Sequence, residues 1–288
     1  MTRHRKLSSL LGAVLGTFCA LALLAVQAHA SDWVTEEFHK TYPLSADGRV
    51  SLENINGSVH ISGWDKSEVQ VDAVKRAGSR ERLEEAKIEV EAGPFAISVR
   101  THYPDRDLTF NSDDDRHNPA TVEYTLHVPH AARIDEVKLI NGGLDIQGLT
   151  GEVHASSING KVVARELNGR TELSTVNGRV EADFARLGTS PIELSSVNGS
   201  VRLTLPSDAK ADVEANTVMG GISNDFGLRV HHGRYVGHDV DGRLGDGGTR
   251  IRLKNVNGRI EIEHAQDHRP LSPAKDMGSG DRDDDDTI

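Results

Sequence analysis

Imidazole and carboxylate side chains gather in one short segment, RVHHGRYVGHDVDGRLGDGG, at residues 229–248. Such groups, when held close together, are the usual ligands of transition metals and calcium. Their spacing matches no zinc motif, and the Asp-Val-Asp-Gly sequence is far shorter than an EF-hand loop. A polar, glycine-rich insertion is the simpler explanation, so we expect neither a metal nor another cofactor. The residues that would serve if a metal did bind are His231, His232, His238, Asp239 and Asp241, with Asp246 nearby.

A second set of polar groups recurs along the chain, because Asn-Gly is often followed by a basic residue and then, two positions later, by an acid. A ladder of amides and charges on a flat β face would suit a glycan or another polymer. Turn chemistry explains Asn-Gly without a ligand, and exposed ion pairs are weak. The candidate binding residues are Asn159, Lys161, Asn177, Arg179, Asn198, Asn257 and Arg259; Asn141 shares the pattern, and the acids are Asp145, Glu181 and Glu261.

Catalysis on a polysaccharide would require two carboxylates held as a close pair. Glu181 and Glu261 each lie two residues after an arginine, on repeats that need not be neighbours. The sequence shows no nucleophile-elbow serine, no phosphate-binding loop, and no cysteine after residue 30. We therefore assign no catalytic residue and lean towards a non-enzymatic protein, with a carbohydrate-active enzyme on a β-helix as the alternative.

The elements that must position these groups form an internal repeat built around [IV]-Asn-Gly. Its asparagine falls at 56, 141, 159, 177, 198 and 257, and Met219 occupies the same slot in one copy. The 18–21-residue spacing of the central copies predicts a stacked repeat architecture.

Asn-Gly between apolar runs usually indicates a β-hairpin. Here a hairpin would bury Ser196 and expose Val197, and the same mismatch recurs in other copies. A strand that runs straight through the glycine instead places Val197 and Val201 on one inner face, with a bend at Ser195-Ser196. We therefore favour a β-solenoid-like or β-helix stack over an antiparallel meander.

The whole pattern predicts an all-β fold in a single domain, with one short helix near residues 80–87 that begins at Ser79. We expect a lead-in segment at 31–48, a β-strand-repeat domain at 49–265 and a disordered acidic tail at 266–288. The segments 33–48 and 65–133 should cap one end of the stack, and RIEIEH, at 259–264, should close the other. The acidic run Asp113–Asp115 is expected to be a solvated loop.

The order of motifs carries a family resemblance. VEYTLHVP, the repeated [IV]-Asn-Gly segments, VRLTLPSDAKADVEANTVMGGIS and GRLGDGGTRIRLKNVNGRIEIEH together resemble a bacterial putative-adhesin β-strand-repeat family of unknown function, related to auto-transporter adhesin head domains. The resemblance covers residues 50–264 and departs from the family at Met219 and in the His-rich insertion at 229–240. It implies an exported, β-solenoid-like protein without established catalytic residues.

The first thirty residues have the form of a secretory signal. A basic start precedes an apolar run from Leu7 to Val26 and the small-x-small sequence Ala28-His29-Ala30. An uncleaved anchor is the alternative, since the run is near the length of a membrane span. Cleavage near Ala30 would place the chain in the periplasm or outside the cell, with no transmembrane segment left in the mature chain.

Charge excludes one class of partner. The formal net charge is −11, and it becomes three units more negative when the basic residues of the predicted signal are removed. Phosphate binding needs a basic footprint, so we expect no nucleic-acid partner.

The sequence thus predicts an exported cell-envelope protein of adhesin-like or scaffold type, which binds an envelope glycan or another envelope protein through an extended β face. A metal- or stress-sensing periplasmic protein that works through the His-rich segment is the third hypothesis. The oligomeric state stays open.

Overall fold

The structure is a computed structural model that describes residues 33–104, 119–233 and 236–277. The predicted signal, the acidic run Asp113–Asp115 and the end of the predicted tail, residues 278–288, lie outside the described residues. None of the helices in these described ranges is long and apolar enough to cross a membrane.

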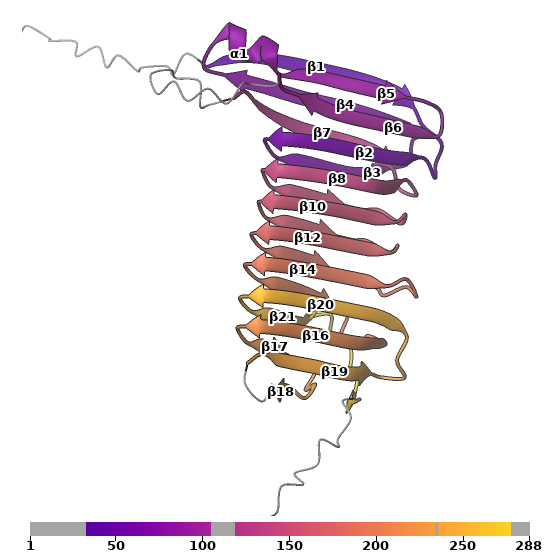
Figure 1. The fold of residues 1–288 in the computed structure, drawn as a ribbon. Coiled ribbons are helices and arrows are strands. Elements are labelled where there is room, and N and C mark those ends of the chain that lie inside the picture. The colour runs from indigo at the N-terminus through magenta and orange to yellow at the C-terminus, as the bar shows by residue number, and fades with distance from the viewer. Residues whose placement is uncertain (1–32, 105–118, 234–235, 278–288) are drawn as a thin grey trace, which may run out of the picture. The chain divides into compact units, whose positions relative to one another are not determined.

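Two β-sheets enclose a single core (Figure 1). In spatial order, the ten-stranded sheet consists of β1 (Val34–Pro43), β4 (Glu68–Ala77), β7 (Thr121–Pro129), β3 (Val59–Trp64), β9 (Leu144–Gln147), β11 (Val162–Arg165), β13 (Val180–Asp183), β15 (Val201–Leu205), β21 (Ile260–His264) and β17 (Ile222–Asn224). The twelve-stranded sheet consists of β18 (His231–His232), β19 (His238–Leu244), β16 (Ala211–Met219), β20 (Thr249–Asn257), β14 (Ile192–Asn198), β12 (Thr171–Asn177), β10 (Val153–Asn159), β8 (Arg133–Asn141), β2 (Arg49–Asn56), β6 (Ala96–His102) and β5 (Lys87–Ala92), with β22 (Ala274–Asp276) paired to β19.

The central repeats form parallel rungs. Each repeat contributes one strand to each sheet, and consecutive repeats pair in parallel, for example β10 with β12 and β11 with β13. Asn159 pairs with Asn177, and Asn177 with Asn198, so the repeat period places equivalent residues side by side. The predicted all-β, solenoid-like stack is confirmed.

The placement of each Asn-Gly differs from the prediction. Ser196 is 3% exposed and Val197 is 40% exposed, so the strand does not run through the glycine with Val197 inside. Instead β14 ends at Asn198 in one sheet and β15 begins at Val201 in the other. Asn-Gly is therefore a corner between two sheets, neither a hairpin nor a continuous strand, and the bend lies at the glycine instead of at Ser195-Ser196.

The segments predicted to cap the first end do so. β4 pairs in antiparallel fashion with β1 and β7, and β5 with β6, at the ends of the two sheets. The predicted helix is α1 (Arg80–Glu85), where the Ser79 hydroxyl accepts a hydrogen bond from the Arg82 amide at 3.3 Å. The lead-in segment contains the ten-residue strand β1.

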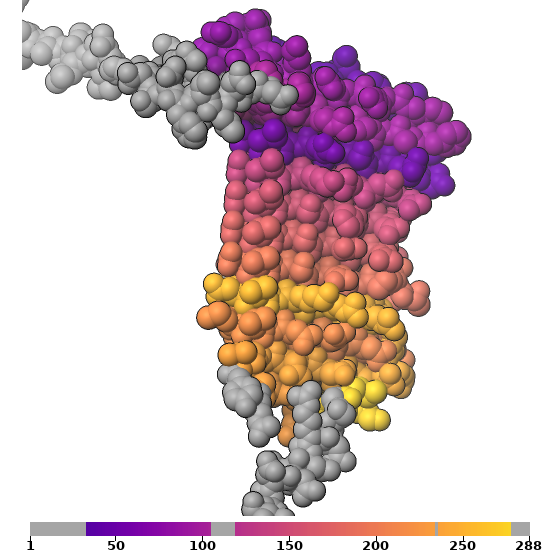
Figure 2. Space-filling view, in the orientation of Figure 1, coloured from indigo at the N-terminus to yellow at the C-terminus, as the bar shows by residue number. Residues whose placement is uncertain are grey.

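The other end departs from sequence order. β20 lies between β14 and β16, and β21 lies between β15 and β17, so RIEIEH is an internal strand instead of the closing one. Figure 2 shows this late segment, in yellow, between orange segments that precede it in the chain. The stack is closed by β17, β18, β19 and β22. Within residues 266–277, the predicted disorder is contradicted at Ala274–Asp276, which pairs with β19.

Aliphatic side chains from both sheets fill the interior. Val180, Leu203 and Ile260 are among those with no exposed surface. Thin rungs leave little room for rings, which agrees with the low aromatic content of 4%. The core positions the corners by fixing the register of every rung.

Candidate functional site

The Asn-Gly corners lie one above another and form a continuous edge between the two sheets. We call it the Asn-Gly edge; its asparagines, in spatial order, are Asn56, Asn141, Asn159, Asn177, Asn198 and Asn257, and Met219 follows them in the last slot. Residues from both ends of the repeat region therefore belong to one surface feature.

Close backbone approach makes glycine necessary at the corner. A Cβ on Gly199 would overlap the carbonyl oxygen of Gly178 on the neighbouring rung, and a Cβ on Gly258 would overlap that of Gly199. No side chain fits between rungs at this point. Glycine therefore recurs at these corners because the neighbouring rung lies too close for a side chain.

Buried polar side chains satisfy those corner carbonyls. Thr175 Oγ1 donates to the Gly160 carbonyl at 3.0 Å, and Ser196 Oγ donates to the Gly178 carbonyl at 3.1 Å. Asn255 performs the same role with its amide, which donates to the Gly199 carbonyl at 3.0 Å. A buried hydroxyl costs little when it is hydrogen-bonded, which is why these polar residues face inward.

The asparagine side chains form an amide ladder along the edge. Asn198 Nδ2 donates to Asn177 Oδ1 at 3.0 Å, and Asn177 donates in the same way to Asn159 at 2.8 Å. The ladder continues through Asn141 to Asn56 at 2.9 and 3.0 Å. Each amide still has one N–H and one lone pair directed away from its neighbours, so the ladder offers ordered donors and acceptors at every rung.

A row of cations follows the ladder on the side of the ten-stranded sheet. Lys161, Arg179, Ser200 and Arg259 occupy equivalent corner positions on successive rungs, joined by backbone hydrogen bonds. Arg179, Ser200 and Arg259 line an open hollow of about 550 Å³, together with Arg202 and Glu261. The predicted candidates therefore come together: the seven binding residues named from the sequence lie on one edge.

Two carboxylates are held among these cations. Arg179 Nη1 donates to Glu181 at 3.0 Å, and Lys161 also contacts Glu181. Burial raises the pKa of Glu181, but hydrogen bonds from Lys161 and Arg179 outweigh burial and leave that pKa below its usual value.

Burial and hydrogen bonding also act in opposite directions on the pKa of Glu261. Burial raises its pKa, but hydrogen bonds from Arg202, at 2.7 and 2.9 Å, and from Arg259 leave the pKa lowered. A glycosidase acid needs a raised pKa, whereas the cations around Glu181 and Glu261 leave the pKa of both carboxyl groups lowered. The two side chains are held as ion-pair partners, on strands separated by β15.

An exposed aliphatic row borders the ladder on the opposite side. It consists of the residue before each corner position from Asn141 to Met219, and the sequence interpretation placed these side chains inside. Their exposed fractions lie between 40% and 50%; the row is Ile140, Ile158, Val176, Val197, Val256 and Val218. The available signal is the polar residue that precedes each of them except Ile140, which follows the buried Leu139. That polar residue marks the inward position once its carbonyl partner is known.

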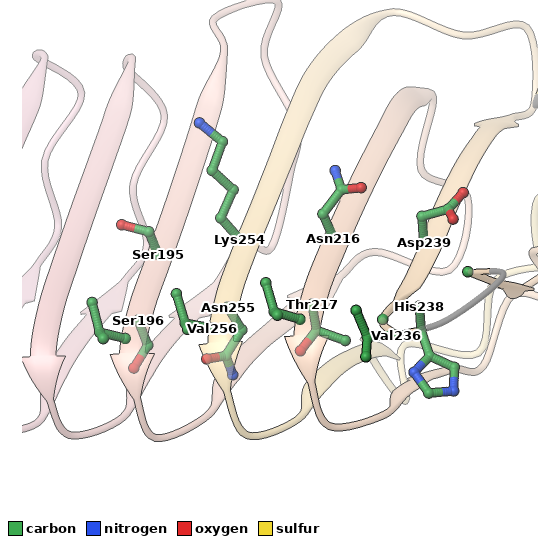
Figure 3. A pocket seen from close by; sticks show the side chains of 14 residues that line it. Ser195, Ser196, Asn216, Thr217, Val236, His238, Asp239, Lys254, Asn255 and Val256 are labelled. Carbon is green, nitrogen blue, oxygen red and sulfur yellow. The ribbon is translucent and has the colours of Figure 1, made fainter.

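At its C-terminal end the aliphatic row borders an open hollow of about 590 Å³. Figure 3 shows Val256 and Thr217 on neighbouring strands, with Val236 and His238 towards one side of the hollow. The lining is mainly aliphatic and hydroxyl-bearing, which suits apolar contact more than charge recognition.

In the described part of the His/Asp segment, residues 229–233 and 236–248, the imidazole and carboxylate groups contact one another and the neighbouring strands. His231 Nε2 lies 3.1 Å from an Asp276 carboxyl oxygen, and its Nδ1 lies 4.0 Å from Asp239. The His232 and His238 rings meet edge to face at 4.7 Å. Within the described ranges, no group of three or more His, Cys, Asp or Glu side chains could hold a metal ion. Asp241 lies opposite Glu214 in the backbone register of β19 and β16, and Asp246 forms an ion pair with Lys210 at 2.9 Å.

Comparison with known proteins gives a family and distant structural likenesses. The Toastrack DUF4097 family profile matches residues 43–263. No curated protein gives a significant match.

Among solved structures, a "putative cell adhesion protein" from Clostridium sporogenes is 14% identical with a TM-score of 0.44, over 81% of this chain and 100% of that one. A "putative adhesin" from Bacteroides fragilis is 10% identical with a TM-score of 0.32, over 80% and 97%. A "putative lipid binding protein" from Parabacteroides distasonis is 9% identical with a TM-score of 0.36, over the same shares.

Proposed function

The chain belongs to the Toastrack DUF4097 family, and from this premise we propose that it is an exported, non-enzymatic envelope protein of adhesin-like or scaffold type. Its contact surface is the Asn-Gly edge, and its partner is an envelope glycan or another envelope protein. The signal-like first thirty residues support export to the periplasm or the cell exterior.

One observation carries the proposal: amides repeat on successive rungs along one edge, and Lys161, Arg179 and Arg259 add a cation on three of those rungs. Side chains that are already ordered by mutual hydrogen bonds lose little conformational entropy on binding. Neighbouring rungs lie about 4.8 Å apart, so a repeating partner can make the same contact several times. Affinity is then spread over rungs instead of concentrated in a pocket.

Local charge supports contact with an acidic or mixed partner. Lys161, Arg179, Arg202 and Arg259 surround the carboxylates of Glu181 and Glu261, and Glu263 reaches Arg202 at 3.4 Å. The edge therefore carries charges of both signs, on a chain whose net charge is −11.

The test is co-sedimentation of the exported chain with isolated bacterial cell walls and with outer-membrane vesicles. The edge variant combines Lys161→Gln with Arg259→Gln, because Glu181 and Glu261 keep Arg179 and Arg202 as partners. Arg76→Gln, at an exposed ion pair of the N-terminal cap, is the matched control.

We expect saturable binding that the control retains and the edge variant loses several-fold. Equal binding by all three chains would contradict the proposal. Loss of binding in chelator would instead favour the His/Asp segment as the functional site, and release of soluble sugar from the cell walls would favour an enzyme.

A further inference from the structure

The strand β1 is the longest open sheet edge in the described residues. Within those ranges the two sheets end at β1, β17, β18 and β5. β1 has ten residues, whereas β17, β18 and β5 have three, two and six. Figure 1 shows β1 at one end of the stack. Proteins usually keep open edges short, because an unpaired edge can add a strand from another chain. β1 is therefore the edge best able to take a further strand.

The outer side of β1 carries backbone groups without partners at alternate residues. The Leu44 amide, directly after β1, donates to the Ser67 carbonyl, directly before β4, at 3.2 Å. Alternate residues of an antiparallel strand direct N–H and C=O to the same neighbour, so the even-numbered residues of β1 face β4. The odd-numbered residues face the open edge, where no described residue bonds their backbone; they are Thr35, Glu37, His39 and Thr41. Pro43, which lacks an N–H, faces the same open side.

The helix α1 borders only part of β1. The Lys75 ammonium group on β4 binds Glu36 at 2.8 Å and donates to the carbonyls of Leu83 and Ala86, so α1 lies near the first half of β1. Six helical residues span about 9 Å, whereas ten strand residues span about 33 Å. Most of the edge of β1 is therefore out of reach of α1.

We propose that β1 pairs in antiparallel fashion with β1 of a second copy of this chain, about a two-fold axis through Phe38. An axis perpendicular to the sheet keeps corresponding faces on the same side, so residues of one face meet only residues of that face. The axis must then pass through a single residue, which meets its own counterpart. No residue of the Asn-Gly edge lies on β1, so the inference goes beyond the proposed function and does not rest on it.

The sequence of β1 is self-complementary in this register. With Phe38 on the axis, Glu36 lies opposite Lys40 of the copy on the inner face. On the outer face, Glu37 lies opposite His39 of the copy. The remaining positions match as well, since Val34 meets Tyr42 and Thr35 meets Thr41. Opposite charges and apolar pairs directly across a sheet stabilise the pairing.

The neighbouring registers lack this match. An axis through Glu37 would bring the two Glu37 carboxylates together, and an axis through Lys40 would bring the two Lys40 ammonium groups together. Like charges directly opposite each other destabilise a sheet. An axis through His39 would set Lys40 opposite Phe38, and Glu36 opposite Tyr42. The charges therefore select the axis through Phe38.

The charged groups of β1 are open to the copy. Lys40 places its Nζ 5.2 Å from the centre of its own Phe38 ring. Glu36 keeps 41% of its side chain exposed beside Lys75, and His39 keeps 68% exposed beside Asp72. An inward-facing lysine on an edge strand usually prevents pairing. Because an acid of the copy lies opposite Lys40 in the proposed register, reversing its charge should weaken association, whereas a blocking lysine would give the opposite result.

Single cysteines read the register directly, in a chain with Cys19→Ser. Phe38→Cys would meet its counterpart at a non-hydrogen-bonded position with Cα atoms about 4.5 Å apart, within the range of about 4.4–6.8 Å that a disulfide spans. Glu37→Cys, His39→Cys and Lys40→Cys are the matched controls, because their counterparts lie at least two residues further along the strand, about 8 Å away or more.

Under mild oxidation we expect a disulfide-linked dimer for Phe38→Cys and monomers for the three controls. A dimer from one control alone would overturn the axis through Phe38. Equal cross-linking of all four variants would show random collision, and no cross-linking at any position would show that β1 does not pair with itself; either result would overturn the proposal.

Sedimentation velocity of the exported chain provides a measurement without cysteines. It compares the wild type with Lys40→Glu and with Lys87→Glu, a matched control at an exposed position of the other N-terminal edge strand, β5. We expect dimers for the wild type and for Lys87→Glu. Lys40→Glu should associate at least about tenfold more weakly, since two like-charge contacts replace two attractive ones.

Unchanged or stronger association of Lys40→Glu would overturn the proposal, and so would weakening by Lys87→Glu alone, which would place the contact at β5. A monomeric wild type that still binds envelope fractions would overturn the self-pairing and leave the proposed function standing. A dimeric wild type that binds no envelope fraction would do the reverse.

Discussion

Replacing the buried hydroxyl of Thr175 by a methyl group, in Thr175→Val, tests why polar residues face the interior of this stack. Thr175 is 3% exposed, and its Oγ1 donates to the Gly160 carbonyl at 3.0 Å. Valine has nearly the same shape, so packing changes little while the carbonyl loses its donor. A buried group left without its partner costs about 1–3 kcal/mol. Because this corner is part-buried, we expect a loss near the lower end, about 1–2 kcal/mol.

Urea unfolding followed by circular dichroism measures this loss. With a urea dependence of about 3 kcal/mol per molar, at the upper end of the usual range, the midpoint should fall by about 0.3–0.7 M. The control is Val176→Thr, at the exposed neighbouring position, which should change stability by less than about 0.5 kcal/mol. An unchanged or raised midpoint for Thr175→Val would refute the idea that glycine carbonyls hold the hydroxyls inside.

Three further predictions follow from the same contacts. Gly199→Ala should destabilise the chain by about 3 kcal/mol or more, the upper end of overpacking costs, whereas Gly221→Ala, where a Cβ meets nothing within 4 Å, should be nearly neutral; equal effects in urea unfolding would contradict the corner packing. Because the pKa of Glu181 is lower in the folded chain than its value near 4.5 in the unfolded chain, its ion pairs stabilise the fold fully above pH 4.5, and this stabilisation is lost as pH falls through the folded pKa. Glu181→Gln should therefore flatten the fall in thermal stability below pH 4.5. An unchanged pH profile would count against the ion pairs. Ending the chain at Pro273, which removes β22, should lower the thermal midpoint relative to a chain ending at Met277, and identical midpoints would show that the β22–β19 pairing adds nothing.

Periodicity predicts much of the candidate edge from sequence. Equivalent residues 18–21 positions apart must stack if each repeat is one rung, which brings Asn159, Asn177 and Asn198 together. Asn257 lies much further along the chain, yet its motif matches and it joins the same column. The seven binding candidates followed from motif identity alone.

The direction of the side chains at the corner was not predictable from polarity. Polar Ser196 would normally face water and Val197 the core, but the partner of Ser196 is a backbone carbonyl on another rung. Such a partner is visible only once the rungs are stacked. The aliphatic row was therefore assigned to the interior, and its role as a surface was missed.

Strand order was not predictable for a similar reason. Every Asn-Gly strand presents the same register, so any two fit side by side, and sequence order was the only guide to neighbours. The structure places β20 between β14 and β16, and β20 pairs with both in the same parallel register. β22 makes backbone hydrogen bonds over three residues, which need no hydrophobic pattern, so composition pointed to disorder.

The proposed function depends on one continuous edge, in which the rung of Asn198 is followed by the rung of Asn257. Neighbouring parallel strands lie about 4.8 Å apart, within the range of about 4.4–6.8 Å between Cα atoms that a disulfide spans. In a chain with Cys19→Ser, the pair Ser195→Cys and Lys254→Cys occupies directly paired positions, whereas Asn216 lies one strand further away. The account predicts an intramolecular disulfide for the 195/254 pair and none for the 195/216 pair; a disulfide for 195/216 without one for 195/254 would contradict it.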